Sequence, residues 1–401
     1  MMLSRNRCDV LLVCCALSMG GCTTLFFGGG KHLGEGLPGS TEGEVVKKLD
    51  PTRVGVTADK CLGTGVYDAS QLLEAGNEQF NATNFERARN CFALLAGEFP
   101  DDSRRNTALY NLGVTNIRLG RLVEAEEALT EMLVSGPLHP RADDARLELG
   151  LLFLERGEFS NAAHELHKVV ENPHGEPYLI IRAMALLGRA AIAEKEYVLA
   201  EDHLWRAFHG YKRAERDGDY VDSHLMGTIL FYQAGIKDNL MEDSVVVAPR
   251  DNSKEEQSRS FKSLEAKASW LVDAQKGYLR VIRVGNRYWA TAAGYRIGVM
   301  YESLHRHLAE LPAPDELNAE ESAVYREELN SRLAVLLRKS VRVFKKVCSI
   351  AKRLNLSNQW VKASEESLSR LMVSLEVSSA TDEQPRKEQL LDRAASTPNA
   401  L

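Results

Sequence analysis

From Ala69 onward, apolar residues recur every three or four positions, which is the spacing of amphipathic helices. A longer repeat is superimposed on this pattern, because a glycine returns after 37, 37 and 38 residues, at Gly76, Gly113, Gly150 and Gly188. An alanine follows each glycine by twelve residues, and a large apolar residue follows each alanine by four: Ala88 and Phe92, Ala125 and Leu129, Ala162 and Leu166, Ala200 and Leu204. The first three units end near Pro100, Pro137 and Pro173.

This pattern predicts pairs of antiparallel helices. The glycine and alanine positions are where two helices cross too closely for a larger side chain, and the proline ends the second helix. A single pair cannot bury its own apolar face, so consecutive pairs must stack on one another. We therefore expect a stack of four helix pairs within residues 67–242.

The remainder of the chain is also predicted to be helical, but it is less regular. One helix is expected over 223–241, and residues 243–260 are predicted to be an exposed linker because they are polar and contain Pro249. A second helical pair (261–284 with 288–311) and two further helices (319–354 and 360–375) make up a C-terminal helical region, 261–377. Residues 378–401 are polar and are expected to form a disordered tail.

The N-terminus has a different composition. Arg5 and Arg7 precede a run of ten mostly apolar residues, which is too short to cross about 30 Å of hydrocarbon as a helix. With Gly20 and Gly21 before Cys22, residues 1–21 are predicted to be a signal peptide. Eight of the next twenty residues from Gly20 are glycine, so residues 22–66 are predicted to be a flexible tether.

Composition and charge narrow the choice of function. The chain has 401 residues, of which 44% are hydrophobic and 26% charged, as in an ordinary globular protein. Its net charge of −6 gives no electrostatic reason to expect nucleic acid or an anionic membrane surface as the main partner. The sequence has no nucleophile motif and no phosphate-binding loop, so we expect no enzyme activity, no cofactor and no small-molecule substrate.

Two groups of polar residues are candidate sites. His164 and His167 share one helix face, but no cysteine or carboxylate cluster accompanies them, so a structural or solvated role is favoured and no metal site is predicted. A basic helix face is formed by Arg338, Lys339, Arg342, Lys345 and Lys346. A solvated role is favoured for this face over lipid binding.

The repeat spacing resembles the tetratricopeptide repeat (TPR) family. The third unit shows the resemblance best, with Leu149, Gly150, Phe153, Gly157, Phe159 and Ala162 at the family's positions. The fourth unit is degenerate, because Lys195 occupies the position of the turn glycine. The resemblance implies an all-α fold, an α-solenoid of TPR helix pairs with a divergent TPR-like helical C-terminal half.

The resemblance also implies a protein-binding groove. In TPR solenoids the first helix of each pair lines the concave side, where the positions three before, one after and four after the glycine share a face. These positions are Leu73, Asn77, Phe80, Tyr110, Val114, Ile117, Leu147, Leu151, Leu154, Ala185, Arg189 and Ile192. The face is mainly apolar, which suits an amphipathic or extended segment of a partner. Alternatively, residues 223–241 or the C-terminal helices fill the groove within the same chain.

The N-terminus resembles a bacterial lipoprotein signal, in which small residues precede a lipidated cysteine. This resemblance implies that Cys22 carries the lipid and anchors the chain in a membrane, facing the periplasm. Because Thr23 rather than aspartate follows the cysteine, the outer membrane is favoured over the inner membrane. Simple secretion and an uncleaved N-terminal segment are the alternatives.

The C-terminal half resembles gliding-motility-associated TPR lipoproteins of deltaproteobacteria. The resemblance is carried by residues 278–282, 289–290, 295–298 and 312–317 together with Tyr301, Tyr325, Asn358 and Trp360. It implies a non-enzymatic scaffold that organises an envelope complex, in motility or trans-envelope machinery, by binding other envelope proteins. The alternative is an accessory of outer-membrane protein assembly, resembling the TPR lipoprotein of the β-barrel assembly machinery.

Three cysteines remain outside the signal and the lipid acceptor: Cys61, Cys91 and Cys348. In an oxidising periplasm an exposed pair tends to oxidise. A bridge between Cys61 and Cys91 would pin the end of the tether onto the first helix pair and cap it, whereas two free thiols are the alternative. Cys348 is expected to pack as a small apolar residue.

Overall fold

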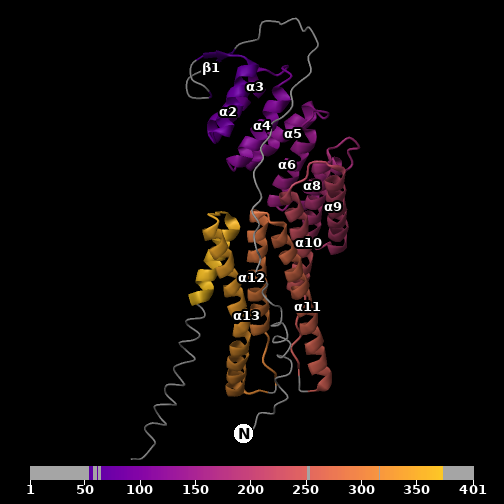
Figure 1. The fold of residues 1–401 in the computed structure, drawn as a ribbon, viewed down its shortest axis with the longest axis vertical. Helices are drawn as coiled ribbons and strands as arrows, with labels where there is room; N and C mark the ends of the chain where they lie inside the picture. The colour runs from indigo at the N-terminus through magenta and orange to yellow at the C-terminus, as the bar shows by residue number, and fades with distance from the viewer. Residues whose placement is uncertain (1–53, 57–60, 62–64, 251–252, 316, 374–401) are drawn as a thin grey trace, which may run out of the picture. The chain divides into compact units, whose positions relative to one another are not determined.

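The computed structural model describes residues 54–56, 61, 65–250, 253–315 and 317–373 (Figure 1). Apart from two short strands, these residues form an all-α fold. They divide into two compact units, an N-terminal unit that ends at Ala183 and a C-terminal unit that begins at Met184. The predicted signal peptide, Cys22, most of the predicted tether and the predicted tail lie outside the described residues.

Three helix pairs follow one another in the N-terminal unit. They are α2 (Ala69–Asn81) with α3 (Phe85–Glu98), α4 (Arg105–Arg118) with α5 (Leu122–Ser135), and α6 (Ala142–Glu155) with α7 (Phe159–Val170). Helix α3 also packs against α4, and α5 packs against α6, so the pairs are stacked as the repeat pattern predicts. A fourth pair, α8 (Pro177–Ala193) and α9 (Tyr197–Asp217), follows along the chain, and the boundary between the two units falls within α8.

The repeated glycines lie where the two helices of each pair cross. A Cβ atom added at Gly113 would lie 2.5 Å from Cγ of Leu129, and one added at Gly188 would lie 2.5 Å from Cγ of Leu204. The close crossing predicted at the glycines is therefore present, and its contact with leucine explains why no larger residue fits there.

The turn between the paired helices uses a left-handed backbone conformation in all four units. The residues concerned are Thr83, Gly120, Gly157 and Lys195, with φ of 61°, 74°, 76° and 63°. Glycine adopts this conformation without steric cost, whereas threonine and lysine do not. The fourth unit, degenerate in sequence at Lys195, nevertheless forms a regular helix pair.

The end of the predicted tether is ordered, which corrects the prediction for residues 22–66. Strands β1 (Val54–Val56) and β2 (Gly65–Tyr67) form an antiparallel hairpin in which Val54 lies opposite Tyr67. Helix α2 begins two residues after β2, with a capping box formed by Asp68 and Gln71. Glycine content indicates a flexible backbone. It does not exclude a hairpin that is held by contacts of its loop residue Cys61 with the first helix pair.

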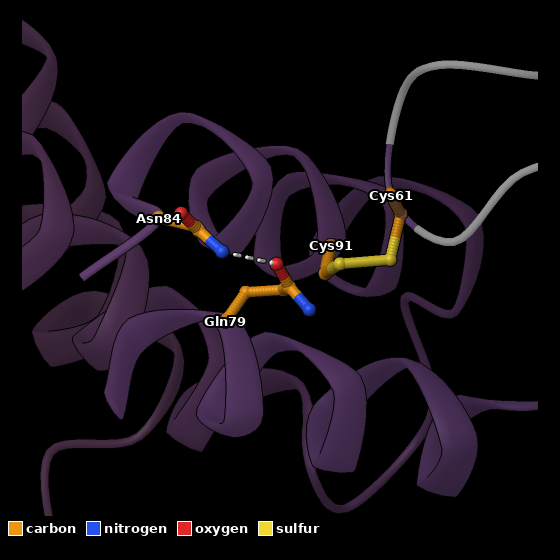
Figure 2. Close-up of a disulfide and its surroundings, with 4 residues drawn as sticks. All are labelled: Cys61, Gln79, Asn84 and Cys91. Atoms are coloured by element: carbon orange, nitrogen blue, oxygen red, sulfur yellow. Dashed lines mark hydrogen bonds between the residues drawn. A yellow bond between two sulfur atoms is a disulfide. The ribbon is translucent and has the colours of Figure 1, made fainter. Parts of the chain in front are cut away.

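Cys61 lies in the hairpin loop and is bonded to Cys91 of α3, with their Cα atoms 4.9 Å apart (Figure 2). Both cysteines are buried in a core cluster that includes Leu72, Leu95 and Phe99. Beside the bridge, Asn84 at the start of α3 donates a hydrogen bond to Gln79 of α2 (Figure 2). Cys61 thus belongs to the apolar core of the first helix pair.

The C-terminal unit contains longer helices. They are α10 (Ser223–Asp243), α11 (Lys254–Val284), α12 (Arg287–Ala309) and α13 (Ala319–Arg353), followed by a helical segment that begins at residue 359. Helix α10 packs along α11, and α12 packs along α13. The predicted pairing of 261–284 with 288–311 is therefore not the main one, although α11 and α12 also touch.

The predicted exposed linker over 243–260 is wrong for its second half. Helix α11 begins at Lys254 with Ser253 as its N-cap, and Ser260 is buried. Even in the connecting segment Val246 is buried. A run of polar residues occurs both in solvent-exposed helical turns and in loops. Composition alone therefore does not distinguish a helix from a loop in this segment.

Glycine also sets close crossings in the C-terminal unit. An added Cβ at Gly227 of α10 would lie 2.5 Å from the Trp289 ring of α12, and one at Gly277 of α11 would lie 2.7 Å from Cβ of Ala234. Gly298 of α12 faces the Phe344 ring of α13 in the same way. Among the described helices, none combines the length and the apolar character that crossing a membrane requires.

Candidate protein-binding surface

Nine of the predicted groove residues lie on α2, α4 and α6 in the N-terminal unit, and we call them the first-helix face. Asn77 is exposed, and six others are half-buried: Leu73, Phe80, Tyr110, Val114, Ile117 and Leu151. These seven side chains remain accessible to a partner. The other three predicted positions, Ala185, Arg189 and Ile192, lie in the C-terminal unit.

Three predicted groove residues are buried, which corrects their assignment to an accessible groove. Leu147 and Ala185 are 0% exposed and Leu154 is 4% exposed. Helix α6 has buried residues around most of its circumference, eight in all, whereas α2 has four. The same repeat position is therefore accessible on α2 and enclosed on α6, a difference that the repeat pattern does not contain.

Several half-buried members of the first-helix face also support the core. Leu73 packs against the cluster around Leu72 and Leu95, and Tyr110 and Ile117 pack against the cluster around Leu109 and Leu129. A partner would therefore meet the outer edges of these side chains, and a substitution there affects folding as well as binding.

Polar contacts join neighbouring repeats across the first-helix face. The side-chain amide of Asn111 donates to the amide oxygen of Asn77 at 3.0 Å, which links α4 to α2. The guanidinium of Arg141 lies 5.1 Å from the centre of the Tyr110 ring. Sequence reasoning missed Asn111, which precedes the repeat glycine by two positions and shares its helix face with Tyr110 and Val114.

Carboxylates border the same surface on α6. Burial raises the pKa of the Tyr110 hydroxyl, and the nearby carboxylates of Asp144 and Glu148 raise it further. Burial also raises the pKa of Asp144 itself, while Glu148 faces Arg182 at 3.6 Å. The surface is therefore an apolar band with an acidic edge, which the three groove positions of each repeat do not include.

The described residues show no arrangement for metal chemistry. No group of three or more His, Cys, Asp and Glu side chains among them is placed to hold a metal ion. The His164 side chain is 70% exposed and its ring lies 3.9 Å from Glu165 on the same helix.

The C-terminal unit contains a buried polar centre that the sequence did not indicate. Asp238 of α10 is 0% exposed and accepts hydrogen bonds from the Tyr278 hydroxyl of α11, at 2.7 Å, and from Nε of Arg296 of α12, at 2.8 Å. Burial raises the pKa of the Asp238 carboxyl, while the Arg296 guanidinium and the Tyr278 hydroxyl act against this. One carboxylate thus ties three helices together.

A second buried charge lies at the end of α10. The ammonium of Lys267 donates to the carbonyl oxygens of Met241 and Ser244, at 2.5 and 2.6 Å. It thereby satisfies carbonyls that the helix leaves without partners, and its charge is favourable at a helix C-terminus. Burial lowers the pKa of Lys267, and the neighbouring carboxylates of Glu242 and Asp243 oppose this.

Stacked helix pairs, close glycine crossings and repeated left-handed turns define an α-solenoid of TPR-type helix pairs. A family model described as tetratricopeptide repeat matches residues 73–140, which span α2 to α5 apart from the first few residues of α2. No curated protein matches the chain.

Three solved structures are among those that the chain matches. A tetratricopeptide repeat protein from Parabacteroides merdae is 17% identical, with 76% of this chain and 98% of that chain covered and a TM-score of 0.37. The TPR domain of P58(IPK) is 16% identical, with coverages of 77% and 99% and a TM-score of 0.28. The assembly chaperone of RpL4, Acl4, is 11% identical, with coverages of 78% and 100% and a TM-score of 0.26.

Proposed function

We propose that this protein is a non-enzymatic scaffold that binds partner proteins through the first-helix face. The observation that carries the proposal is the band of accessible apolar side chains on α2, α4 and α6, which lies within stacked TPR-type pairs. Apolar side chains beside hydrogen-bonding groups such as Asn77 suit an amphipathic helix or an extended segment of a partner. A few of these side chains would supply most of the affinity.

The proposal extends to where the scaffold acts. The lipoprotein-like N-terminus supports a lipid on Cys22, which would hold the chain at the periplasmic face of a bacterial membrane, with the outer membrane favoured. The resemblance of the C-terminal half to motility-associated lipoproteins supports partners from motility or trans-envelope machinery. An accessory role in outer-membrane protein assembly is the second candidate, and the identity of the partner separates the two.

Site-specific photocrosslinking in cells tests the binding surface. A photoreactive phenylalanine analogue at Asn77 or Leu151 should give discrete protein adducts, which mass spectrometry identifies. The matched control is the same analogue at Val123 or Val134, which are 62% and 78% exposed on α5. Adducts that are equally strong from the α5 positions, or absent from Asn77 and Leu151, would show that this face does not bind the partner.

Labelling with radioactive palmitate tests the anchor. Two or more acyl chains hold a protein on a membrane nearly permanently, because each buried CH₂ contributes about 0.8 kcal/mol. The wild-type protein should carry the label, and the Cys22→Ala variant should remain an unlabelled precursor. A Cys22→Ala protein that is processed and labelled like the wild type would rule out the lipoprotein anchor while leaving the scaffold proposal intact.

A further inference from the structure

Charge is distributed unevenly along the C-terminal unit. Between Leu329 and Ser364 the sequence contains no aspartate or glutamate, although the whole chain has a net charge of −6. The same stretch contains nine cationic residues: Arg332, Arg338, Lys339, Arg342, Lys345, Lys346, Lys352, Arg353 and Lys362. The proposed protein-binding surface lies in the N-terminal unit, so it does not explain this concentration of positive charge.

Six of these cations lie on one side of α13, and we call them the basic ridge: Arg338, Arg342, Lys345, Lys346, Lys352 and Arg353. All six are exposed. At 3.6 residues per turn they fall within about a third of the helix circumference. The opposite side of α13 is buried, through residues that include Leu336, Phe344 and Val347. At 1.5 Å per residue the basic ridge is about 22 Å long.

The basic ridge is not neutralised by neighbouring acidic side chains. Within the described residues, no hydrogen bond or ion pair joins any of its six side chains to another residue. Other cations of the C-terminal unit do have such partners, since Arg332 pairs with Glu328 and Arg370 pairs with Glu302. Six like charges held side by side without counter-charges repel one another, so an anionic surface that meets them is stabilising.

The side chains between these cations indicate which anionic surface fits. Protein interfaces depend on aromatic and large apolar anchors, and single-stranded nucleic acids stack on aromatic rings. None of the exposed large hydrophobic side chains of the described residues lies on the basic ridge; the one on α13, Val324, precedes it by more than three turns. A helix face whose exposed side chains are six cations and the small polar Ser349 attracts mainly by charge, as polybasic segments do toward anionic lipids.

We propose that the basic ridge of α13 docks on the surface of a bilayer that contains anionic phospholipid, in place of the solvated role that the sequence favours for this helix face. The contact is electrostatic and reversible, with the lysine and arginine side chains among the lipid headgroups and no residue inserted into the hydrocarbon. It is separate from the first-helix face and does not require a lipid on Cys22.

Vesicle binding tests this proposal. The full-length chain with Cys22→Ser, which carries no acyl group, is mixed with vesicles of phosphatidylcholine alone or with about one-third phosphatidylglycerol. Neutralising three ridge cations (Arg342→Gln, Lys345→Gln and Lys346→Gln) should weaken binding to the anionic vesicles about a hundredfold, since each cation contributes about a fivefold effect. Raised salt should weaken the binding of the unsubstituted ridge.

A matched control removes the same net charge elsewhere. Lys262, Arg280 and Arg283 are exposed on α11, and their triple glutamine variant should bind anionic vesicles as the parent chain does. The proposal is overturned if the two triple variants lose binding equally, or if the parent chain binds both kinds of vesicle alike. Tighter binding to a DNA duplex or to polyglutamate than to anionic vesicles, with the same loss in the ridge variant, would also overturn it. Circular dichroism establishes that the variants are folded.

Discussion

At the scale of single residues, the distance between paired helices is set by glycines that face large side chains. Gly113 and Gly150 each lie opposite a leucine of the following helix, and Gly298 lies opposite Phe344. The two glycine–leucine contacts are local and recur at a fixed spacing, so the sequence alone could predict where these helices cross, whereas the contact of Gly298 with Phe344 does not follow that spacing. Buried polar residues such as Asp238 do not recur, and their partners come from helices far away in sequence.

Replacing Gly113 with alanine should destabilise the N-terminal unit by about 1 to 3 kcal/mol, because the new methyl group would overlap the Leu129 side chain. Gly97 is the matched control, since it lies in α3 with open space around it. Gly97→Ala should stabilise by about 0.5 to 1 kcal/mol through helix propensity. Urea unfolding followed by circular dichroism measures both changes. Equal effects of the two substitutions would contradict the close crossing at Gly113.

Replacing Asp238 with alanine should destabilise the C-terminal unit by about 2 to 4 kcal/mol. The change leaves the buried Tyr278 hydroxyl and the partly buried Arg296 guanidinium without their acceptor. Glu328→Ala removes an exposed partner of Arg332 and should cost less than about 1 kcal/mol. All four tryptophans of the chain lie after Met184, so the midpoint of urea unfolding followed by tryptophan fluorescence reports on the C-terminal unit.

At the scale of helices and strands, the N-terminal pairs agree with the sequence pattern and the later pairs differ from it. In α2 to α9 the two helices that touch are neighbours in sequence, joined by a short turn, so local spacing determines the pairing. The four helices α10 to α13 are long and can meet several others, and burial decides which contacts dominate. Burial also decides the accessibility of Leu147 and Leu154 on α6. The repeat spacing does not contain this burial, so their accessibility could not be predicted from their repeat positions.

The hairpin of β1 and β2 depends on its bridge, because two strands of three residues each are marginal by themselves. A disulfide that closes a 30-residue separation should stabilise the first helix pair by about 3 to 4 kcal/mol in the chain-entropy model. Reduction, or the double variant Cys61→Ser and Cys91→Ser, should increase amide hydrogen exchange in α2 and α3. Cys348→Ser should leave that exchange unchanged. Unaltered protection of α2 and α3 after reduction would show that the bridge does not hold the hairpin in place.

At the scale of the whole molecule, the two units are stabilised in different ways. The N-terminal unit repeats a small set of glycine, alanine and leucine contacts, whereas the C-terminal unit adds buried charges and aromatic rings such as Trp289 and Phe231, whose centres lie 4.9 Å apart. Buried ionisable groups make the stability of the second unit depend on pH.

The free energy of unfolding of the C-terminal unit should fall as the pH is lowered from 7 to 5. Burial lowers the pKa of both His305 and His307, so the folded state takes up these protons at a lower pH than the unfolded chain does. The unfolded chain binds these protons below a pH of about 6.5, which favours unfolding in acid. Replacing both histidines with glutamine should make the urea midpoint, measured by tryptophan fluorescence, less dependent on pH. An unchanged pH dependence in this double variant would show that other groups are responsible.

The order of the cysteines along the chain has a consequence for biosynthesis. A ribosome releases the N-terminus first, so Cys61 and then Cys91 emerge long before Cys348. The two bridged cysteines are therefore synthesised within 30 residues of each other. Cys61 has its partner within reach as soon as α3 is complete. Cys348 can mispair only if the bridge has not formed before hundreds of further residues are synthesised. In the folded chain its half-buried position within α13 shields that thiol.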